Sequence, residues 1–290
     1  MSSLSLWGIF VTIASAMAQT VFSSNFYFAL RFLPKEKRQA MFMFYRFCRV
    51  VDDVVDLAKD NGNAQAELTR WKKEVALCYE GEPSHPIAVS LKSLIQHYQI
   101  PRQDIEDLLA GVEMDLVPRR FANFNELEQY CYRVASVVGL VCLRIFGCQH
   151  SDSRQYAIYL GKALQLTNIL RDLKQDADQG RVYIPQNELA RFGYPENSLL
   201  QGVYNDSFVD LMQFQCQRAR AFFEQAQARM PEQDLRNLFP ARIMGEIYQR
   251  ILDRIDQCRY NVFDQRVSLP LGEKLLIAIK HRVFRSLTCE

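Results

Sequence analysis

The spacing of apolar residues limits the fold more than any other feature of this chain, because it follows the helical period through nearly all 290 residues. A long helix is predicted to begin after Pro34 and to end at the polar run Asp60-Asn61-Gly62-Asn63. Further helices are predicted at about 64–80, 86–98, 102–117, 124–147, 152–178, 205–229, 241–263 and 271–286. Proline or glycine separates these runs, and alternating strand patterns with hairpin turns are absent. The sequence therefore predicts an all-α protein.

An apolar segment at residues 1–19 precedes a single predicted domain at 20–290, because no linker and no fixed repeat divides the rest of the chain. Ala16-Met17-Ala18 resembles a signal-peptide cleavage site, but residues 1–18 contain no lysine or arginine. We therefore expect a helix that packs on the domain or on a membrane surface, with a signal peptide as the alternative. No other run of about 20 apolar residues predicts a transmembrane anchor.

Composition excludes one class of partner and suggests a compartment. The net charge is +2 at pH 7 and no long run of lysine or arginine occurs, so nucleic-acid binding is not expected. The eight cysteines show no C-x-x-C pairing, which favours a reduced, cytoplasmic compartment, with membrane association as the alternative. Aromatic residues at 12% suit an apolar pocket, and they suit a well-filled core equally well.

A polar stripe runs along the predicted helix that contains residues 41–58. Tyr45, Arg49, Asp52 and Asp56 lie at offsets 0, 4, 7 and 11, which places them on one face of a helix that is otherwise strongly apolar. Burying two carboxylates is unfavourable unless a positive group joins them. The alternative is a structural ion pair of Arg49 with Asp52 or Asp53, or a solvated face.

A second polar stripe has nearly the same spacing. Gln165, Asn168, Asp172 and Asp176 lie at offsets 0, 3, 7 and 11 within the predicted helix 152–178. The amide and carboxylate groups offer hard oxygen ligands, which Mg²⁺ prefers, and Mg²⁺ commonly bridges carboxylates to substrate phosphates. Two such stripes, with Arg49, Arg171 and Arg181 nearby in the sequence, predict a clamp for a diphosphate.

A third helix carries a mainly apolar stripe. Tyr130, Val134, Val137 and Val141 lie at offsets 0, 4, 7 and 11, with small residues between them. Such a stripe usually packs in a core. Beside a diphosphate site it is also suited to line an apolar tunnel.

Five motifs follow one another along the chain. They are Ser23-Ser24-Asn25-Phe26-Tyr27, Tyr45-x-x-x-Arg49-x-x-Asp52-Asp53-x-x-Asp56, the run from Tyr130 to Gly139, Gln165-Leu166-Thr167-Asn168-Ile169-Leu170-Arg171-Asp172-x-x-x-Asp176, and Gly180-Arg181-Val182-Tyr183-Ile184-Pro185. In this order they resemble the squalene/phytoene synthase family, and the likeness covers about residues 20–285. The resemblance implies an isoprenoid synthase fold, which is a single helical bundle around a central apolar cavity with two aspartate-rich motifs at its mouth.

The resemblance also implies a role for each matching residue. The expected ligands of Mg²⁺, or of Mn²⁺ in its place, are Asp52, Asp56, Asn168, Asp172 and Asp176. The residues expected to act in catalysis are Asp52, Asp56, Asp172, Asp176, Tyr130 and Arg49. The residues expected to contact the diphosphate, the reaction centre or the prenyl chains are Ser24, Phe26, Tyr45, Val134, Val138, Gln165, Arg171, Tyr183, Tyr248 and Arg266.

Other short motifs resemble one subgroup, the bacterial presqualene diphosphate synthases. They are His85-Pro86-Ile87, Gly111-Val112-Glu113-Met114-Asp115-Leu116 and Gln265-Arg266-Val267-Ser268-Leu269. This likeness predicts head-to-head condensation of two farnesyl diphosphates to presqualene diphosphate without NADPH, with downstream enzymes of squalene synthesis as partners. The alternatives are a squalene, dehydrosqualene or phytoene synthase, and a remote one is a non-catalytic assembly factor.

Two positions depart from the family pattern. Asn25 stands where serine is usual before Phe26, and Gln175 stands where an acidic residue commonly precedes Asp176. Because Asp172 and Asp176 are both present, we expect the metal site to be retained.

Overall fold

The computed structural model describes residues 29–56, 61–117 and 119–287, and within these ranges it contains helices and no strands. The helices are α3 (Lys35–Asp56), α4 (Asn61–Glu80), α5 (Pro86–Tyr98), α6 (Arg102–Glu113), α7 (Phe124–Cys131), the π-helix η1 (Tyr132–Ser136), α8 (Val137–Phe146), α9 (Ser151–Arg171), α10 (Leu173–Asp178), α11 (Gln186–Arg191), α12 (Glu196–Leu200), α13 (Asp206–Ala228), the 3₁₀-helix η2 (Glu232–Asp234), α14 (Phe239–Gln257) and α15 (Leu271–Leu287). The predicted all-α class is confirmed.

Polar residues that precede the apolar runs begin several of these helices. The side-chain oxygen of Asn123 accepts a hydrogen bond from the backbone N–H of Glu126 at 3.2 Å, and Asn205 accepts one from Phe208 at 2.9 Å. Such caps satisfy backbone groups that have no partner inside the helix. The polar run after Asp60 has a different role from the one predicted, because Asn61, Gly62 and Asn63 form the first turn of α4.

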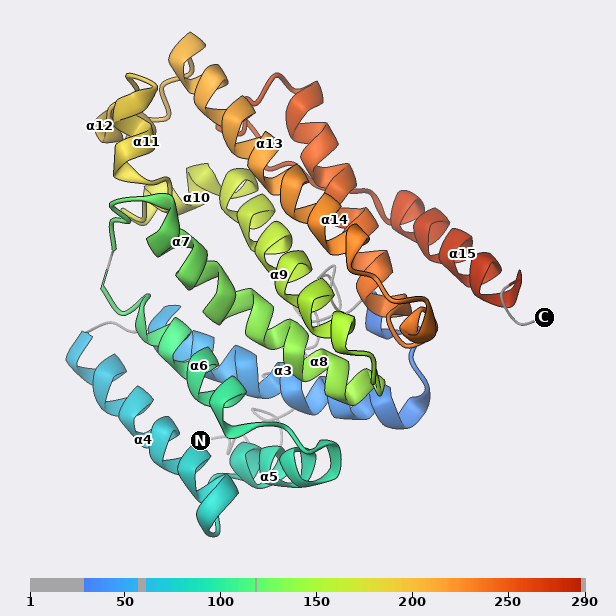
Figure 1. Ribbon diagram of the computed structural model, residues 1–290. Helices are drawn as coiled ribbons and strands as arrows, with labels where there is room; N and C mark the ends of the chain where they lie inside the picture. Colours follow the sequence, from blue (N-terminus) through green and yellow to red (C-terminus); the bar gives the residue numbers. More distant parts are fainter. Residues whose placement is uncertain (1–28, 57–60, 118, 288–290) are drawn as a thin grey trace, which may run out of the picture.

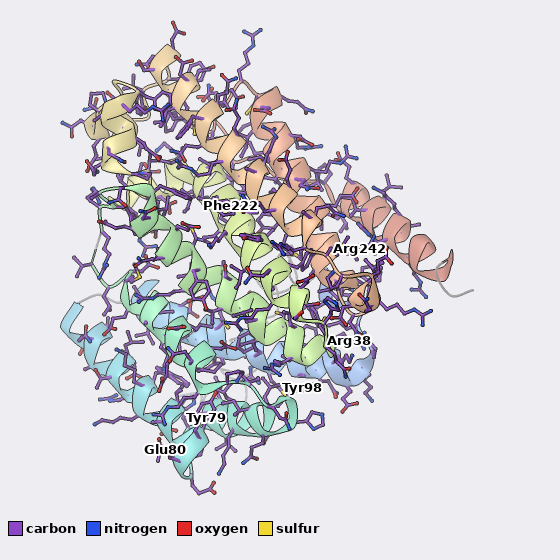
Figure 2. The ribbon with its side chains drawn as sticks, viewed as in Figure 1. Arg38, Tyr79, Glu80, Tyr98, Phe222 and Arg242 are labelled. Atoms are coloured by element: carbon purple, nitrogen blue, oxygen red, sulfur yellow. The ribbon has the colours of Figure 1, made fainter. Side chains whose placement is uncertain are left out.

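The buried apolar side chains form two cores, and the helices that carry them lie on opposite sides of the bundle (Figure 1). One core gathers α3, α4, α5 and α6, and the other gathers α9, α13 and α14. Figure 2 shows Phe222 of α13 in the second core, where its ring lies 6.2 Å from Phe124 of α7 and 6.3 Å from Tyr159 of α9. Helix α8 contributes to both cores, since Val141 is buried in the first and Leu140 in the second.

The stretch Phe124–Phe146 contains a π-helix where one uninterrupted α-helix was predicted. The backbone N–H of Val137 donates to the carbonyl of Tyr132, five residues earlier. Helix α9 approaches this segment so closely that a Cβ on Gly161 would lie 2.5 Å from the Cα of Ser136. The Ser136 hydroxyl donates to the carbonyl of Ile158 at 2.7 Å, which fixes η1 against α9.

The same stretch, Phe124–Phe146, is the one segment among the described residues that is long and apolar enough to cross a membrane. Its most apolar part is 56% buried inside the bundle, as expected for a core helix. The predicted apolar segment at 1–19 lies outside the described residues, so its role stays a prediction.

Candidate active site

A cavity of about 350 Å³ lies between the two apolar cores and is lined mostly by apolar side chains from α3, η1, α8, α9 and α14. Its position matches the predicted central cavity. Along α9 the lining residues run from Tyr156 through Leu160 and Leu164 to Asn168. The twelve helical steps from Tyr156 to Asn168 span about 18 Å at the helical rise, so the cavity is elongated along α9. Asp172 follows one turn after Asn168, which places the second polar motif at one end of the cavity.

In Figure 1 α3 and α9 both run from right to left, so the C-terminal half of the α3 stripe lies towards the same end of the bundle as Asp172. Tyr45 lines the cavity, and Asp52 lies exposed two turns further along the helix. Arg49 forms an ion pair with Asp53, at 2.7 Å between Nη2 and Oδ1, which the alternative interpretation of this stripe predicted. Asp56 is the last residue of α3, and its side chain lies outside the described part of the structure.

The second stripe does not lie on one continuous helix. Helix α9 ends at Arg171, and Asp172 has φ −101° and ψ 10° before α10 begins at Leu173. These dihedrals belong to the sparsely populated bridge region, where active-site residues often occur. Gln165 and Asn168 line the cavity, and the Oδ1 atom of Asn168 is buried without a hydrogen-bond partner. A buried oxygen of this kind is unfavourable unless a cation or donor faces it.

Asp172 is held by two arginines. Arg171 donates from Nε to Oδ1 at 2.9 Å and from Nη2 to Oδ2 at 2.5 Å. Arg266 donates from Nε to Oδ1 at 2.7 Å and from Nη2 to Oδ2 at 3.2 Å. Burial alone would raise the pKa of Asp172, but hydrogen bonds from Arg171 and then Arg266 outweigh burial and hold that pKa below its ordinary value.

Asp176 lies in the opposite electrostatic environment. Burial, the charge of Asp172 and a smaller effect of Asp115 raise the pKa of Asp176 to about 7, although Arg181 partly offsets them. Negative charge therefore accumulates around this residue, and a cation there would relieve it.

Asp115 is a further acidic residue of the site, and it was not predicted. The hydroxyl of Tyr130 donates to its Oδ2 at 2.9 Å, and the hydroxyl of Tyr183 donates to its Oδ1 at 3.1 Å. The two tyrosine rings stack with centroids 5.3 Å apart. Burial, and then the charge of Asp115, raise the pKa of Tyr130 and of Tyr183, so both hydroxyls stay protonated.

Asp115 was present in the motif Gly111-Val112-Glu113-Met114-Asp115-Leu116, which we used only to assign a subgroup. The sequence signal that could have identified Asp115 as a site residue is its position at the end of an apolar helix, three residues before Pro118. Neither Tyr130 nor Tyr183 lines the described cavity, so the predicted place of Tyr130 in the reaction centre remains a prediction.

The third stripe is divided by the π-helix. Val134 and Val138 line the cavity, as predicted, while Val137 and Val141 are fully buried in the core formed by α3 to α6. A π-turn adds a residue to the turn and so rotates the following side chains, which is why the α-helical offsets failed here.

Tyr248 of α14 lines the cavity beside the arginine clamp. Its ring centre lies 5.9 Å from the Arg171 guanidinium, close enough for a cation–π contact. Two other predicted contacts, Ser24 and Phe26, lie outside the described residues.

The family model for squalene/phytoene synthase matches residues 20–273. The chain belongs to the squalene/phytoene synthase family. It is 37% identical to 15-cis-phytoene synthase of Synechococcus elongatus over 88% of this chain and 86% of that protein. It is 35% identical to phytoene synthase of Arthrospira platensis over 88% of this chain and 87% of that one. A crystal structure of a dehydrosqualene synthase superposes with a TM-score of 0.79 at 28% identity, covering 91% of this chain and 92% of that chain.

Membership confirms the predicted family and isoprenoid synthase fold, and it makes this chain a prenyltransferase of the type that condenses prenyl diphosphates head to head. The family uses divalent metal ions with its diphosphate substrates. The residues present fit such an ion, because Asn168 Oδ1 is buried without a partner and the neighbouring acidic groups offer hard oxygens. Among the described residues no cluster of three or more acidic, histidine or cysteine side chains would hold a metal alone.

Proposed function

We propose that this chain is a phytoene synthase, which joins two geranylgeranyl diphosphates head to head and releases both diphosphates. The proposal adopts one of the alternatives from the sequence, because the relatives at 37% and 35% identity are both named phytoene synthases. It replaces farnesyl diphosphate and presqualene diphosphate as the first-choice substrate and product.

The observation that carries the proposal is an elongated apolar cavity with polar motifs from α3 and α9 at one end. A diphosphate at that end would lie near the guanidinium groups of Arg171 and Arg266. Its departure leaves negative charge on oxygen, and positive groups placed there stabilise the transition state. The apolar cavity would then receive the prenyl chain attached to it.

The proposed metal ligands are Asp52, Asp56, Asn168, Asp172 and Asp176. A bound Mg²⁺ would neutralise charge on the departing diphosphate. The protein's own contribution is to hold that diphosphate at the end of the cavity and to keep water from the allylic cation. Tyr45, Gln165 and Tyr248 lie along the cavity wall, where ring faces and amide dipoles can stabilise positive charge.

The proposed reaction requires no reductant. Departure of the first diphosphate leaves a cation, which the double bond of the second prenyl chain attacks, and proton loss closes a cyclopropane. Departure of the second diphosphate and loss of another proton then give a hydrocarbon. If the second departure did not follow, the cyclopropyl diphosphate would be the product, as the presqualene diphosphate prediction required.

Incubation with geranylgeranyl diphosphate and Mg²⁺, with and without NADPH, tests the proposal. We expect a C40 hydrocarbon in equal amount in both reactions, identified by mass analysis of the quenched mixture. A C40 product that keeps its diphosphate would support the family and contradict the proposed end product. A hydrocarbon that forms only with NADPH would contradict the redox-neutral final step.

A C30 synthase is the second candidate, because the crystal structure at TM-score 0.79 is named a dehydrosqualene synthase. The same incubation with farnesyl diphosphate tests it. A C30 product from farnesyl diphosphate, with none from the longer substrate, would favour this candidate.

A further inference from the structure

Asp172 has no free coordination position in this structure. An ionised carboxylate accepts hydrogen bonds at about four lone-pair positions. Arg171 and Arg266 each donate one N–H group to Oδ1 and one to Oδ2, which fills those positions. A metal ion that bound Asp172 would therefore have to displace one of the two guanidinium groups.

The two arginines differ in how firmly they are placed. Arg171 is buried at the end of α9 and lies against the Tyr248 ring. Arg266 lies in the loop between α14 and α15, and its side chain is 52% exposed. Exposed ion pairs are weak, whereas breaking a buried one leaves an uncompensated charge. Arg266 is therefore the group that would leave Asp172.

The backbone around Arg266 is held while its side chain is exposed. The next residue, Val267, and Leu269 beyond it are both buried. Arg254 of α14 donates to the carbonyl of Ser268 at 2.9 Å. The guanidinium can thus change partner by side-chain rotation, without movement of the loop.

We propose that Arg266 holds Asp172 in the substrate-free enzyme and exchanges it for a diphosphate oxygen when metal binds, so that metal and diphosphate bind cooperatively. This rests on the proposed function, since it takes Asp172 as a metal ligand and a diphosphate as substrate. A released guanidinium beside a metal ion would be repelled by it, and an arriving diphosphate stabilises both charges. A metal ion that binds alone must compete with Arg266 for Asp172. A metal ion that binds together with a diphosphate does not, because Arg266 then contacts the diphosphate.

Binding of Mn²⁺ to the substrate-free protein, followed by the loss of its free EPR signal, measures the first half of the proposal. Arg266→Gln removes the competitor, so we expect Mn²⁺ to bind about threefold to tenfold more tightly than to the wild type. Arg102→Gln is the matched control, because Arg102 is 42% exposed and pairs with Glu106 and Glu80 elsewhere in the bundle. It should bind Mn²⁺ like the wild type.

Calorimetric binding of pyrophosphate at saturating Mn²⁺ measures the second half. Here Arg266→Gln should bind about tenfold more weakly, because a charge-assisted contact to the diphosphate is lost. Opposite signs in the two measurements support the exchange. Weaker or unchanged Mn²⁺ binding by Arg266→Gln overturns it, since a purely structural arginine would give that result. Unchanged Mn²⁺ binding by Asp172→Asn overturns it as well, because Asp172 would then not be a ligand.

Product analysis of the same preparations separates this inference from the proposed function. If the wild type forms a C40 hydrocarbon but Arg266→Gln does not gain Mn²⁺ affinity, only the exchange is wrong. If opposite binding effects are found but no C40 product forms, the exchange holds and the assigned substrate is wrong.

Discussion

At the scale of single residues, the acidic groups of the site differ sharply in their surroundings. Asp172 is held by two arginines, while Asp176, one turn later, has its pKa raised to about 7 by burial and by the charge of Asp172. The two arginines thus keep the Asp172 carboxylate ionised. The surroundings of Asp176 instead favour the binding of an added cation. The equal spacing of the two motifs along the chain did not indicate this difference.

Asp172→Asn should abolish turnover while the helical fold is kept, because an amide cannot supply the charge that a metal ion requires. Loss of a metal ligand removes several kcal/mol of transition-state stabilisation, or roughly a thousandfold in rate. Asp178→Asn is the control, since Asp178 is exposed on α10 and pairs with Lys174. Steady-state assays at saturating Mg²⁺ measure both. Near-normal turnover of Asp172→Asn would contradict the assigned role.

Each of the two tyrosine hydroxyls donates to its own carboxylate oxygen of Asp115. Asp115→Asn should destabilise the protein, because the asparagine amide has only one acceptor oxygen for the two hydroxyls. A buried hydroxyl without an acceptor costs about 1–3 kcal/mol of unfolding free energy. Asp107→Asn, on α6 just before the turn that holds Asp115, is the control, because the hydrogen bond that Asp107 accepts from Gln103 is exposed. Thermal unfolding of both variants measures the effect, and equal melting temperatures would show that the Asp115 contacts contribute little.

At the scale of helices, the sequence predicted the helix ends that local residues determine. It did not predict the irregular turns that lie against neighbouring helices. The extents of α5 and α13 were close to those predicted, because their caps and breaks are encoded nearby, as at His85 and Asn205. The π-helix lies in close contact with Gly161, and the break at Asp172 coincides with the contact of Arg266, ninety-four positions away. No local pattern reports either contact.

Gly161→Ala tests the close approach of α9 to η1. The added Cβ would lie 2.5 Å from the Ser136 Cα and 2.6 Å from its backbone nitrogen, so one helix must shift. Overpacking of this kind costs about 1–3 kcal/mol of unfolding free energy. Gly272→Ala is the control, since no heavy atom lies within 4 Å of its Cβ and the change should be neutral or stabilising. Denaturant unfolding compares them. A stable Gly161→Ala protein would contradict the tight contact.

His281 attaches α15 to α14 through a hydrogen-bonding contact with Glu246 at 2.8 Å, and Lys280 also pairs with Glu246. Burial, and then the charge of Arg242, lower the pKa of His281 below its ordinary value of 6.5, although Glu246 opposes them. Figure 2 shows Arg242 on α14, on the side of the bundle that carries α15. The folded protein therefore binds a proton at His281 less readily than the unfolded chain does.

This difference predicts the direction of a pH effect. A depressed folded pKa contributes stability above the unfolded value, and that stability is lost as pH falls through and below about 6.5. The melting temperature should thus fall between pH 7.5 and pH 5.5. His281→Asn should reduce that fall, which thermal unfolding across the pH range measures. The same dependence in wild type and His281→Asn would assign the effect to other groups.

At the scale of the whole molecule, two apolar cores enclose one elongated cavity, and the polar motifs of α3 and α9 lie at one end of it. The fold class and the places of Val134 and Val138 in the cavity wall were predictable, because helical periodicity and motif order carry that information. The length of prenyl chain that the cavity accepts was not predictable. It depends on how side chains such as Tyr156 and Phe146, from different helices, close the cavity together.

The most direct test of the central claim is a competition between equal concentrations of geranylgeranyl and farnesyl diphosphate, with Mg²⁺ and without NADPH. Mass analysis of the quenched reaction reports which chains are joined and whether a diphosphate remains. The account predicts that a C40 hydrocarbon dominates. A C30 product alone, whether hydrocarbon or cyclopropyl diphosphate, would contradict it.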